Sequence, residues 1–257
     1  MQMKINLDVS KNVEENAAVY YEKAKKAKRK LEGAEEAIGK SVLKLEQAKK
    51  KQEEAEKKAE QKVSRKKEWY EKFRWFFSSE GFLCIGGRDA ATNEIVIKKY
   101  TSEDDIVFHT SMAGSPFFVI KTEGGKPGDA TLNETAQATA SYSRAWKAGI
   151  ASVEVFHVKP EQVTKEAKAG EYIQRGAFMI YGRKNFISAS LEIAVGIKNN
   201  VIIGGPVDAV KANAVRFVKV EQGNMKASDA AKKIRKKLGG GELDEIIRFL
   251  PSGGYSL

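Results

Sequence analysis

Side chains that commonly carry out catalysis are few and widely spaced in this sequence of 257 residues. The two histidines, His109 and His157, end separate apolar stretches, and the one cysteine, Cys84, lies inside another. The motifs of zinc proteases, serine hydrolases and dinucleotide-binding enzymes do not occur, and no second cysteine exists to form a disulfide or a cysteine-based zinc site. We therefore expect no catalytic residue, no metal and no cofactor, and predict that the protein is not an enzyme.

One loop keeps a chemical role open. His109 precedes residues 110–116, which are mostly small or polar and whose backbone N–H groups suit a phosphate group. An ordinary turn between strands, beside a hydrogen-bonded histidine, explains the same residues. A hydrolase that acts on nucleic acid through Asp89 or His109 and a metal ion is an alternative, which metal-dependent turnover would reveal.

Positive charge is the strongest global signal. The chain has 45 Lys and Arg residues against 34 Asp and Glu, a formal net charge of +11. Such an excess is typical of proteins that bind nucleic acid or an anionic membrane surface, although a solvated basic face gives the same totals. No apolar run is long enough to span a bilayer, and the N-terminus does not resemble a signal peptide, so we expect a cytoplasmic protein.

Several cations stand next to aromatic or glycine residues. Arg88 follows Gly86 and Gly87 at an expected strand end, where another backbone would approach closely, although local pairing of Arg88 with Asp89 is an equal alternative. Residues 181–186 interleave basic and aromatic side chains, a mixture that suits RNA because cations meet phosphates and rings stack on bases. The predicted nucleic-acid-binding residues are Arg74, Arg88, Lys98, Lys99, His109, Arg144, Lys147, Arg183 and Lys184.

These residues must be positioned by helices and strands. The order of the expected helices and strands predicts a mainly antiparallel α+β domain over residues 69–220. Residues 90–93 are expected to form a hairpin turn between the first two strands. A helix is predicted from Thr131, with Glu134 completing a capping box, to Lys147. The aromatic residues of 69–77 follow helical spacing and are expected to be core. The expected strands are residues 82–86, 94–100, 106–109, 117–121, 153–158, 177–181, 185–188, 191–197, 201–203 and 215–220.

Two helical regions flank this domain. Residues 1–68 carry a seven-residue repeat of Ala-rich apolar positions, which predicts a coiled-coil arm, either one long helix or two with a loose bend. Residues 221–257 predict a basic helical extension with helices at 228–238 and 243–250. Segment 208–238 holds nine Lys and Arg residues against three Asp and Glu, the second basic concentration of the chain.

The chain resembles the NFACT-R domain, the presumed RNA-binding domain of ribosome-quality-control proteins, in its archaeal form. The resemblance rests on residues 69–100, WYEKFRWFFSSEGFLCIGGRDAATNEIVIKKY, and residues 170–186, GEYIQRGAFMIYGRKNF. Residues 15–38, ENAAVYYEKAKKAKRKLEGAEEAI, are similar to the start of the family's middle coiled coil. Full members begin with an NFACT-N domain, which this sequence lacks, so we expect a stand-alone short member or a piece of a longer protein.

The resemblance implies a protein that binds large ribosomal subunits obstructed by peptidyl-tRNA. We therefore predict a non-catalytic protein whose partners are ribosomal RNA or tRNA and the large ribosomal subunit, with no membrane partner. The alternative is an adaptor whose arm binds a partner helix or a second copy of itself. Removal of residues 1–67 separates the two predictions, because it should abolish adaptor binding and leave RNA binding largely intact.

Overall fold

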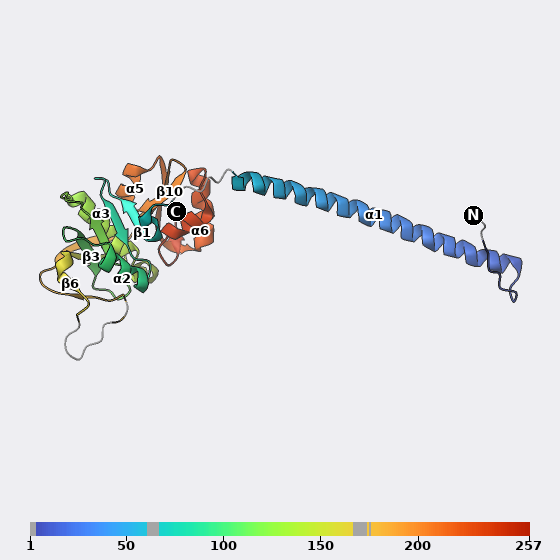
Figure 1. Cartoon of the computed structure of the whole chain (residues 1–257), viewed down its shortest axis with the longest axis horizontal. Coiled ribbons are helices and arrows are strands. Elements are labelled where there is room, and N and C mark those ends of the chain that lie inside the picture. Colours follow the sequence, from blue (N-terminus) through green and yellow to red (C-terminus); the bar gives the residue numbers. More distant parts are fainter. Residues whose placement is uncertain (1–3, 61–66, 167–173, 175) are drawn as a thin grey trace. The chain divides into compact units, whose positions relative to one another are not determined.

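The computed structural model describes residues 4–60, 67–166, 174 and 176–257, with the backbone alone for residues 50–60. The chain forms two compact units, Met1–Lys66 and Lys67–Leu257 (Figure 1). The predicted domain boundaries after residues 68 and 220 stay predictions, and the second of them falls within strand β11 (Arg216–Met225). Residues 61–66 of the predicted arm, and residues 170–173 and 175 of the second family-like stretch, lie outside the described residues.

The first unit is built on one uninterrupted helix, α1 (Val13–Glu60), of 48 residues. Asn12 begins it with a reciprocal cap, because its Oδ1 accepts the backbone N–H of Glu15 at 2.7 Å while the Glu15 carboxylate accepts the N–H of Asn12 at 3.0 Å. Gly33 and Gly39 lie within the helix without interrupting it. Of the two predicted forms of the arm, the single long helix is the one observed.

The second unit contains a six-stranded antiparallel sheet in the order β1-β2-β4-β3-β5-β8. Helix α3 (Asp129–Ser141) packs against this sheet. The predicted α+β class is confirmed. The strands are β1 (Arg74–Phe77), β2 (Leu83–Gly86), β3 (Ile106–Thr110), β4 (Phe118–Lys121), β5 (Ser152–Val158) and β8 (Asn185–Ser190).

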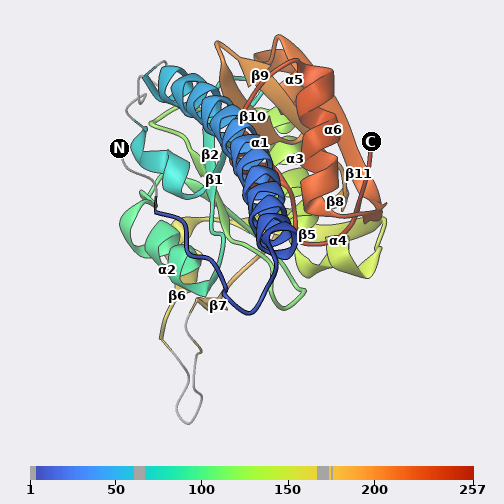
Figure 2. The same ribbon diagram turned by 90° about the vertical axis from the view of Figure 1, so that its right-hand side faces the viewer.

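A second antiparallel sheet, in the order β10-β9-β11-β12, follows in the chain. Its further strands are β9 (Ile193–Lys198), β10 (Val201–Gly205) and β12 (Tyr255–Ser256). Helices α5 (Val207–Asn213) and α6 (Ala227–Leu238) lie beside it, and α7 (Leu243–Phe249) packs on α6 and β10 (Figure 2). A two-stranded ladder joins β6 (Val163–Thr164) to β7 (Met179–Ile180), and the short helix η2 (Pro160–Gln162) precedes it.

Both sheets of the second unit share one hydrophobic core. Phe108 and Phe118 contribute to it from the first sheet, and Ile193 and Val220 from the second. The two sheets are therefore packed as one body, and the residues of the predicted C-terminal extension belong to it, since Ile234 of α6 is fully buried in the same core. The described residues of this core all belong to the second unit.

One predicted strand is wrong. Residues 94–100 were expected to be a strand after a hairpin turn at 90–93, but these residues form helix α2 (Ala90–Lys99). Asp89 is its N-cap: the carboxylate accepts the backbone N–H of Thr92 at 2.8 Å, and the Thr92 hydroxyl accepts the N–H of Asp89 at 2.9 Å. This cap starts the helix despite the Ile-Val-Ile run, which read as a strand because β-branched residues favour strands.

The aromatic stretch was also predicted with the wrong local structure. Instead of a helix end, Trp69–Lys72 form a single 3-10 turn, η1, and Arg74–Phe77 form strand β1. Phe73, Trp75 and Phe76 are buried, as expected of core residues, whereas Trp69 is 44% exposed. The neighbours Trp75 and Phe76 point to opposite faces of β1, so both faces of the strand are covered at this point.

The helix predicted from Thr131 to Lys147 is two helices. Helix α3 begins after Gly128 and ends at Ser141, and α4 (Arg144–Ala148) begins anew with Ser143 as N-cap. Thr131 does not cap α3; its backbone N–H donates to Glu80 at 3.0 Å. Gly149 ends α4 in the left-handed conformation (φ 72°).

Candidate nucleic-acid interface

Three arginines from separate parts of the second unit line one cavity of about 600 Å³. Arg74 comes from β1, Arg88 from the connection between β2 and α2, and Arg144 from the first turn of α4. The other walls are the N-terminus of α2, the loop between β3 and β4, Tyr142 and the residues before β7. We call this the arginine cavity. Like charges converge here because the sheet brings the ends of β1 and β2 together with α4.

Arg88 is anchored by the backbone. Its Nη2 donates to the carbonyl of Phe73 at 3.0 Å and its Nη1 to the carbonyl of Arg248 at 3.3 Å. Its Nε is buried and has no hydrogen-bond partner among the described residues. Burial lowers the pKa of Arg88 to about 10, and the nearby charges of Arg74 and Arg248 add to the effect. Arg88 therefore remains a cation at neutral pH, in an environment that disfavours its charge.

Arg74 is held against an aromatic ring. Its guanidinium carbon lies 4.1 Å from the ring centroid of Tyr142, a cation–π contact. The Tyr142 hydroxyl donates to the carbonyl of Phe249 at 2.7 Å, which fixes the ring. Burial lowers the pKa of Arg74, and no carboxylate forms an ion pair with Arg74, Arg88 or Arg144 in the described part of the chain. Among the described residues the cavity thus holds three guanidiniums and one carboxylate, Asp89, whose negative charge acts on Arg88.

Arg144 lies across the loop between β3 and β4. Gly114 of this loop has φ 81°, and a Cβ added there would lie 2.3 Å from Nε of Arg144. The loop is joined to β2 and α2 by backbone contacts, because Gly87 N–H donates to the carbonyl of Phe117 at 3.1 Å and Phe117 N–H donates to the Asn93 side chain at 3.1 Å. Glycine at position 114 lets the Arg144 side chain rest on the backbone.

Gly86 and Gly87 have a different role from the predicted close approach of another backbone. A Cβ at Gly86 would lie 2.6 Å from the ring of Phe118, and one at Gly87 would lie 1.8 Å from Oδ1 of Asn93. Side chains of the same body therefore occupy the space that these glycines leave open. The predicted alternative was a local pairing of Arg88 with Asp89. In the structure, the Arg88 guanidinium donates to backbone carbonyls and the Asp89 carboxylate caps α2.

His109 is an aromatic wall of the cavity and not one of its charges. Its ring stacks on Phe117 with centroids 4.1 Å apart. Burial lowers the pKa of His109 to about 4, and the nearby Lys184 charge adds to this, so the imidazole is neutral at physiological pH. Phe178 extends the same wall, with its ring edge-on to Phe117 at 5.4 Å. A neutral ring suits contact with a base better than contact with a phosphate.

The cavity brings together Arg74, Arg88, His109 and Arg144, and the other five predicted residues lie outside its walls. Lys98 and Lys99 occupy the last turn of α2, and Lys98 pairs with Glu94 at 2.7 Å. Lys147 is exposed on α4. Arg183 and Lys184 lie between β7 and β8, where Lys184 Nζ stands 4.4 Å from the ring centroid of Phe156.

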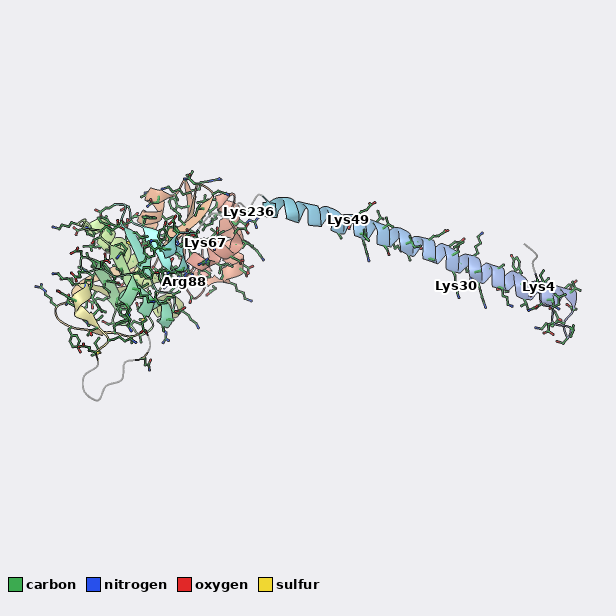
Figure 3. All side chains as sticks on the ribbon, viewed as in Figure 1. Lys4, Lys30, Lys49, Lys67, Arg88 and Lys236 are labelled. Carbon is green, nitrogen blue, oxygen red and sulfur yellow. The ribbon has the colours of Figure 1, made fainter. Side chains whose placement is uncertain are left out.

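A second basic surface was not among the predicted site residues. Helix α6 buries Ala230, Ala231, Ile234 and Leu238 and exposes its cations on the opposite face, where Lys236 is labelled in Figure 3. The signal was present in the basic segment 208–238, but exposure is decided only by the packing of α6. We call these residues the α6 row: Lys232, Lys233, Arg235, Lys236 and Lys237.

Arg248 is a further cation that sequence reasoning missed. It lies in the last turn of α7, its carbonyl accepts from Arg88, and its own Nη2 donates to the carbonyl of Glu71 at 3.1 Å. Nothing in the sequence places α7 beside η1 and β2, because these segments are far apart in the chain.

Groups suited to catalysis are not assembled in the described residues. No cluster of three or more His, Cys, Asp and Glu side chains that could hold a metal is found there. Cys84 is buried, and burial raises the pKa of its thiol to about 12, so it is a core residue as predicted. The described helices include none that is both long and apolar enough to cross a membrane.

Comparison with known proteins shows that the region containing the cavity is similar to a known protein domain. Residues 72–182 match the NFACT protein RNA binding domain. The archaeal Rqc2 homolog aRqcH of Methanocaldococcus jannaschii is 41% identical over 203 residues, covering 76% of this chain and 30% of that protein. The ribosome quality control complex subunit NEMF of Homo sapiens is 41% identical over 180 residues, covering 68% of this chain and 16% of that protein.

The chain thus spans less than a third of the length of these two relatives. Among solved structures, the C-terminal part of the fibronectin/fibrinogen-binding protein from Streptococcus suis matches with a TM-score of 0.41 and 18% identity, over 49% of each chain. The three cavity arginines and His109 all fall within the matched residues 72–182, whereas the α6 row falls outside them.

Proposed function

The chain belongs to the NFACT family and contains the RNA-binding domain of that family, and on this premise we propose that it binds structured RNA of the large ribosomal subunit, with tRNA bound there as part of the recognised surface. The curated relatives are named as ribosome quality control subunits, which supports a role in that process. The protein acts as a binding factor and not as an enzyme.

One observation carries the proposal. Cations are concentrated in and beside the matched domain, and most of them stand without a carboxylate partner among the described residues. This holds for the arginine cavity and for four of the five residues of the α6 row, since only Lys232 pairs there, with Asp229 at 3.6 Å. Phosphates of a folded RNA would supply the missing counter-charges. The other predicted contacts, Lys98, Lys99, Lys147, Arg183 and Lys184, remain proposed contacts at the edge of this surface.

Co-sedimentation with large ribosomal subunits, with and without bound tRNA, tests the proposal. We expect binding to be tighter when tRNA is present. The affinity should also fall steeply between 50 and 200 mM salt, by about 10³-fold or more if six or more phosphates are contacted. Binding that does not change with salt would exclude phosphate contacts as its basis. Absence of binding to subunits, tRNA and generic RNA would overturn the proposal.

Reversing two charges of the α6 row tests whether this row contacts the RNA. Lys233→Glu with Lys236→Glu should weaken binding at least several-fold and make the salt dependence shallower by about two phosphate contacts. The matched control is Lys126→Glu, an equally exposed cation in the loop before α3. If the control weakens binding as much as a single α6 reversal does, net charge and not the α6 row determines affinity.

The adaptor alternative keeps one observation in its favour. Three apolar residues seven positions apart on α1, namely Leu31, Ile38 and Leu45, are 59%, 62% and 57% exposed. Such a stripe is typical of a helix that pairs with another helix. Deletion of residues 1–67 would abolish binding to a partner helix and leave RNA binding intact, and loss of RNA binding in that variant would place the RNA contacts on the arm.

A further inference from the structure

The arginine cavity has the features of a site built for one anionic group. Arg74 and Arg88 repel each other, Arg144 lines the same cavity, and the described residues offer none of the three an ion pair with a carboxylate. The buried Nε of Arg88 lacks a hydrogen-bond partner in the same part of the chain. A buried donor without a partner is costly, and converging like charges add to that cost. An anion in the cavity would relieve both.

The shape and the second wall of the cavity indicate what carries that anion. About 600 Å³ is within the usual range of small-molecule sites and is large enough for a nucleoside monophosphate. Guanidiniums and the partly exposed rings of His109 and Phe178 line the same cavity. Guanidiniums bind phosphate oxygens, and flat neutral rings pack on a base.

The charge balance favours a chain end over the middle of a strand. An internal phosphodiester carries one negative charge, whereas a terminal phosphomonoester carries about −1.5 to −2 at pH 7. Three guanidiniums and the Asp89 carboxylate leave an excess of about two positive charges on the described cavity walls, which the second group neutralises better. A concave site also admits the end of a strand without bending the chain on both sides of the bound nucleotide.

We propose that the arginine cavity binds the terminal nucleotide of an RNA through its phosphomonoester, with the base against the His109 and Phe178 rings. This inference rests on the proposed RNA-binding function and names the feature of the RNA that the cavity reads. Arg74 and Arg88 hold the phosphate from fixed positions, and Arg144 closes on it from the exposed side, over Gly114.

Three short single-stranded RNAs of one sequence test the inference: one with a 5′-phosphate, one with a 3′-phosphate and one with hydroxyls at both ends. We expect one of the two phosphorylated RNAs to bind about 10- to 100-fold more tightly than the hydroxyl RNA, which is the usual value of one or two charge-assisted hydrogen bonds. The phosphorylated end that gains affinity identifies the strand polarity. The preference should shrink as the pH falls below about 6, where the monoester becomes singly charged.

Substitutions of the cavity arginines test whether the phosphate preference arises in this cavity. Arg144→Gln should weaken binding of the phosphorylated RNA much more than binding of the hydroxyl RNA, so that most of the phosphate preference is lost. Lys147→Gln is the matched control, because it removes the same charge one turn along the same helix, outside the cavity walls, and should keep the preference. Arg88→Gln should act like Arg144→Gln, and its melting temperature shows whether loss of the Phe73 and Arg248 contacts has unfolded it.

The outcomes separate this inference from the proposed function. Equal affinity for all three RNAs, with steep salt dependence, would overturn the terminal-nucleotide inference and leave RNA binding intact. A phosphate preference that survives both Arg88→Gln and Arg144→Gln would place the phosphate site elsewhere and overturn the assignment to this cavity. Failure of all three RNAs and of the ribosomal subunits to bind would overturn both proposals.

Discussion

At the scale of single residues, burial decides what each titratable group can do. His109 was predicted as a nucleic-acid contact beside a polar loop, but burial lowers its pKa to about 4. Arg88 is also partly buried, yet its pKa of about 10 leaves it charged. Two residues that a sequence presents as similar basic candidates therefore differ in charge at neutral pH, and their roles in the cavity differ accordingly.

His109 makes stability depend on pH in a predictable direction. Its pKa is lowered from 6.5 to about 4, so between these values the unfolded chain binds a proton that the folded chain does not. Stability should therefore fall as the pH falls from 6.5 towards 4, and this one residue accounts for about 2 kcal/mol between pH 7.5 and pH 5. Urea unfolding at the two pH values measures the loss.

The variant His109→Phe keeps a ring on Phe117 and removes the titration. It should lose about 2 kcal/mol less than the parent protein on going from pH 7.5 to pH 5. His157→Phe is a second case of the same effect, since burial also lowers the pKa of that histidine and its replacement should also reduce the loss of stability at pH 5. Identical pH dependence in the parent and in His109→Phe would show that His109 does not titrate as its surroundings imply.

At the scale of elements, register in the first sheet places Gly86 beside a large ring, immediately before the cavity residues Gly87 and Arg88. Gly86 of β2 pairs directly with Phe118 of β4, and the Phe118 ring covers the glycine. The pair leaves the chain free to turn at Gly87 and place Arg88 beside the end of β1. A glycine opposite a large aromatic residue thus positions the neighbouring cation.

A methyl group at Gly86 should disturb this packing. Its Cβ would lie 2.6 Å from the ring of Phe118, which is fully buried and cannot move aside without shifting its neighbours. Gly86→Ala should therefore cost about 1–3 kcal/mol in the free energy of unfolding. Gly240→Ala is the control, because its nearest heavy atom is 3.8 Å away, on Ile197. Equal stability of the two variants in urea unfolding would contradict the role assigned to the pair.

An element can be predicted from the sequence when local apolar periodicity determines it, and less well when a cap or tertiary packing does. The strands ending in His109 and Lys121, the long arm helix and α6 follow from apolar periodicity, which is a local property. Helix α2 does not, because its cap at Asp89 outweighs the strand preference of three β-branched residues. The cavity could be predicted only in part: its arginines were identified one by one, but contacts between Arg88 and the backbone of Phe73 and Arg248 depend on tertiary packing.

At the scale of the whole molecule, the chain consists of two units that differ in what stabilises them. The second unit has a core shared by two sheets, whereas the described side chains of α1 are almost all exposed. A helix without tertiary packing depends on its own hydrogen bonds, caps and side-chain pairs, such as Lys40 with Glu36 at 2.7 Å. The two units should therefore respond separately to heat and denaturant.

Removal of residues 1–66 should leave the melting temperature of the second unit unchanged within about 2 °C, because that unit has its own core. The full-length protein should lose part of its helical circular-dichroism signal before the tertiary structure melts, as an unpacked helix unfolds non-cooperatively. Near-ultraviolet and far-ultraviolet melting curves compare the two events. A single coincident transition, or a large drop in the melting temperature on truncation, would show that the arm and the second unit stabilise each other.

The burial of Cys84 has a practical consequence for following these events in solution. It is the only cysteine of the chain, it is fully buried, and burial raises its pKa to about 12, so thiol reagents at neutral pH should leave it unmodified in the folded protein. A cysteine introduced at an exposed position, such as Lys147→Cys beside the arginine cavity, would be the single reactive thiol. The native sequence thus serves directly as a background for site-specific fluorophores or spin labels, without first removing a residue from the core.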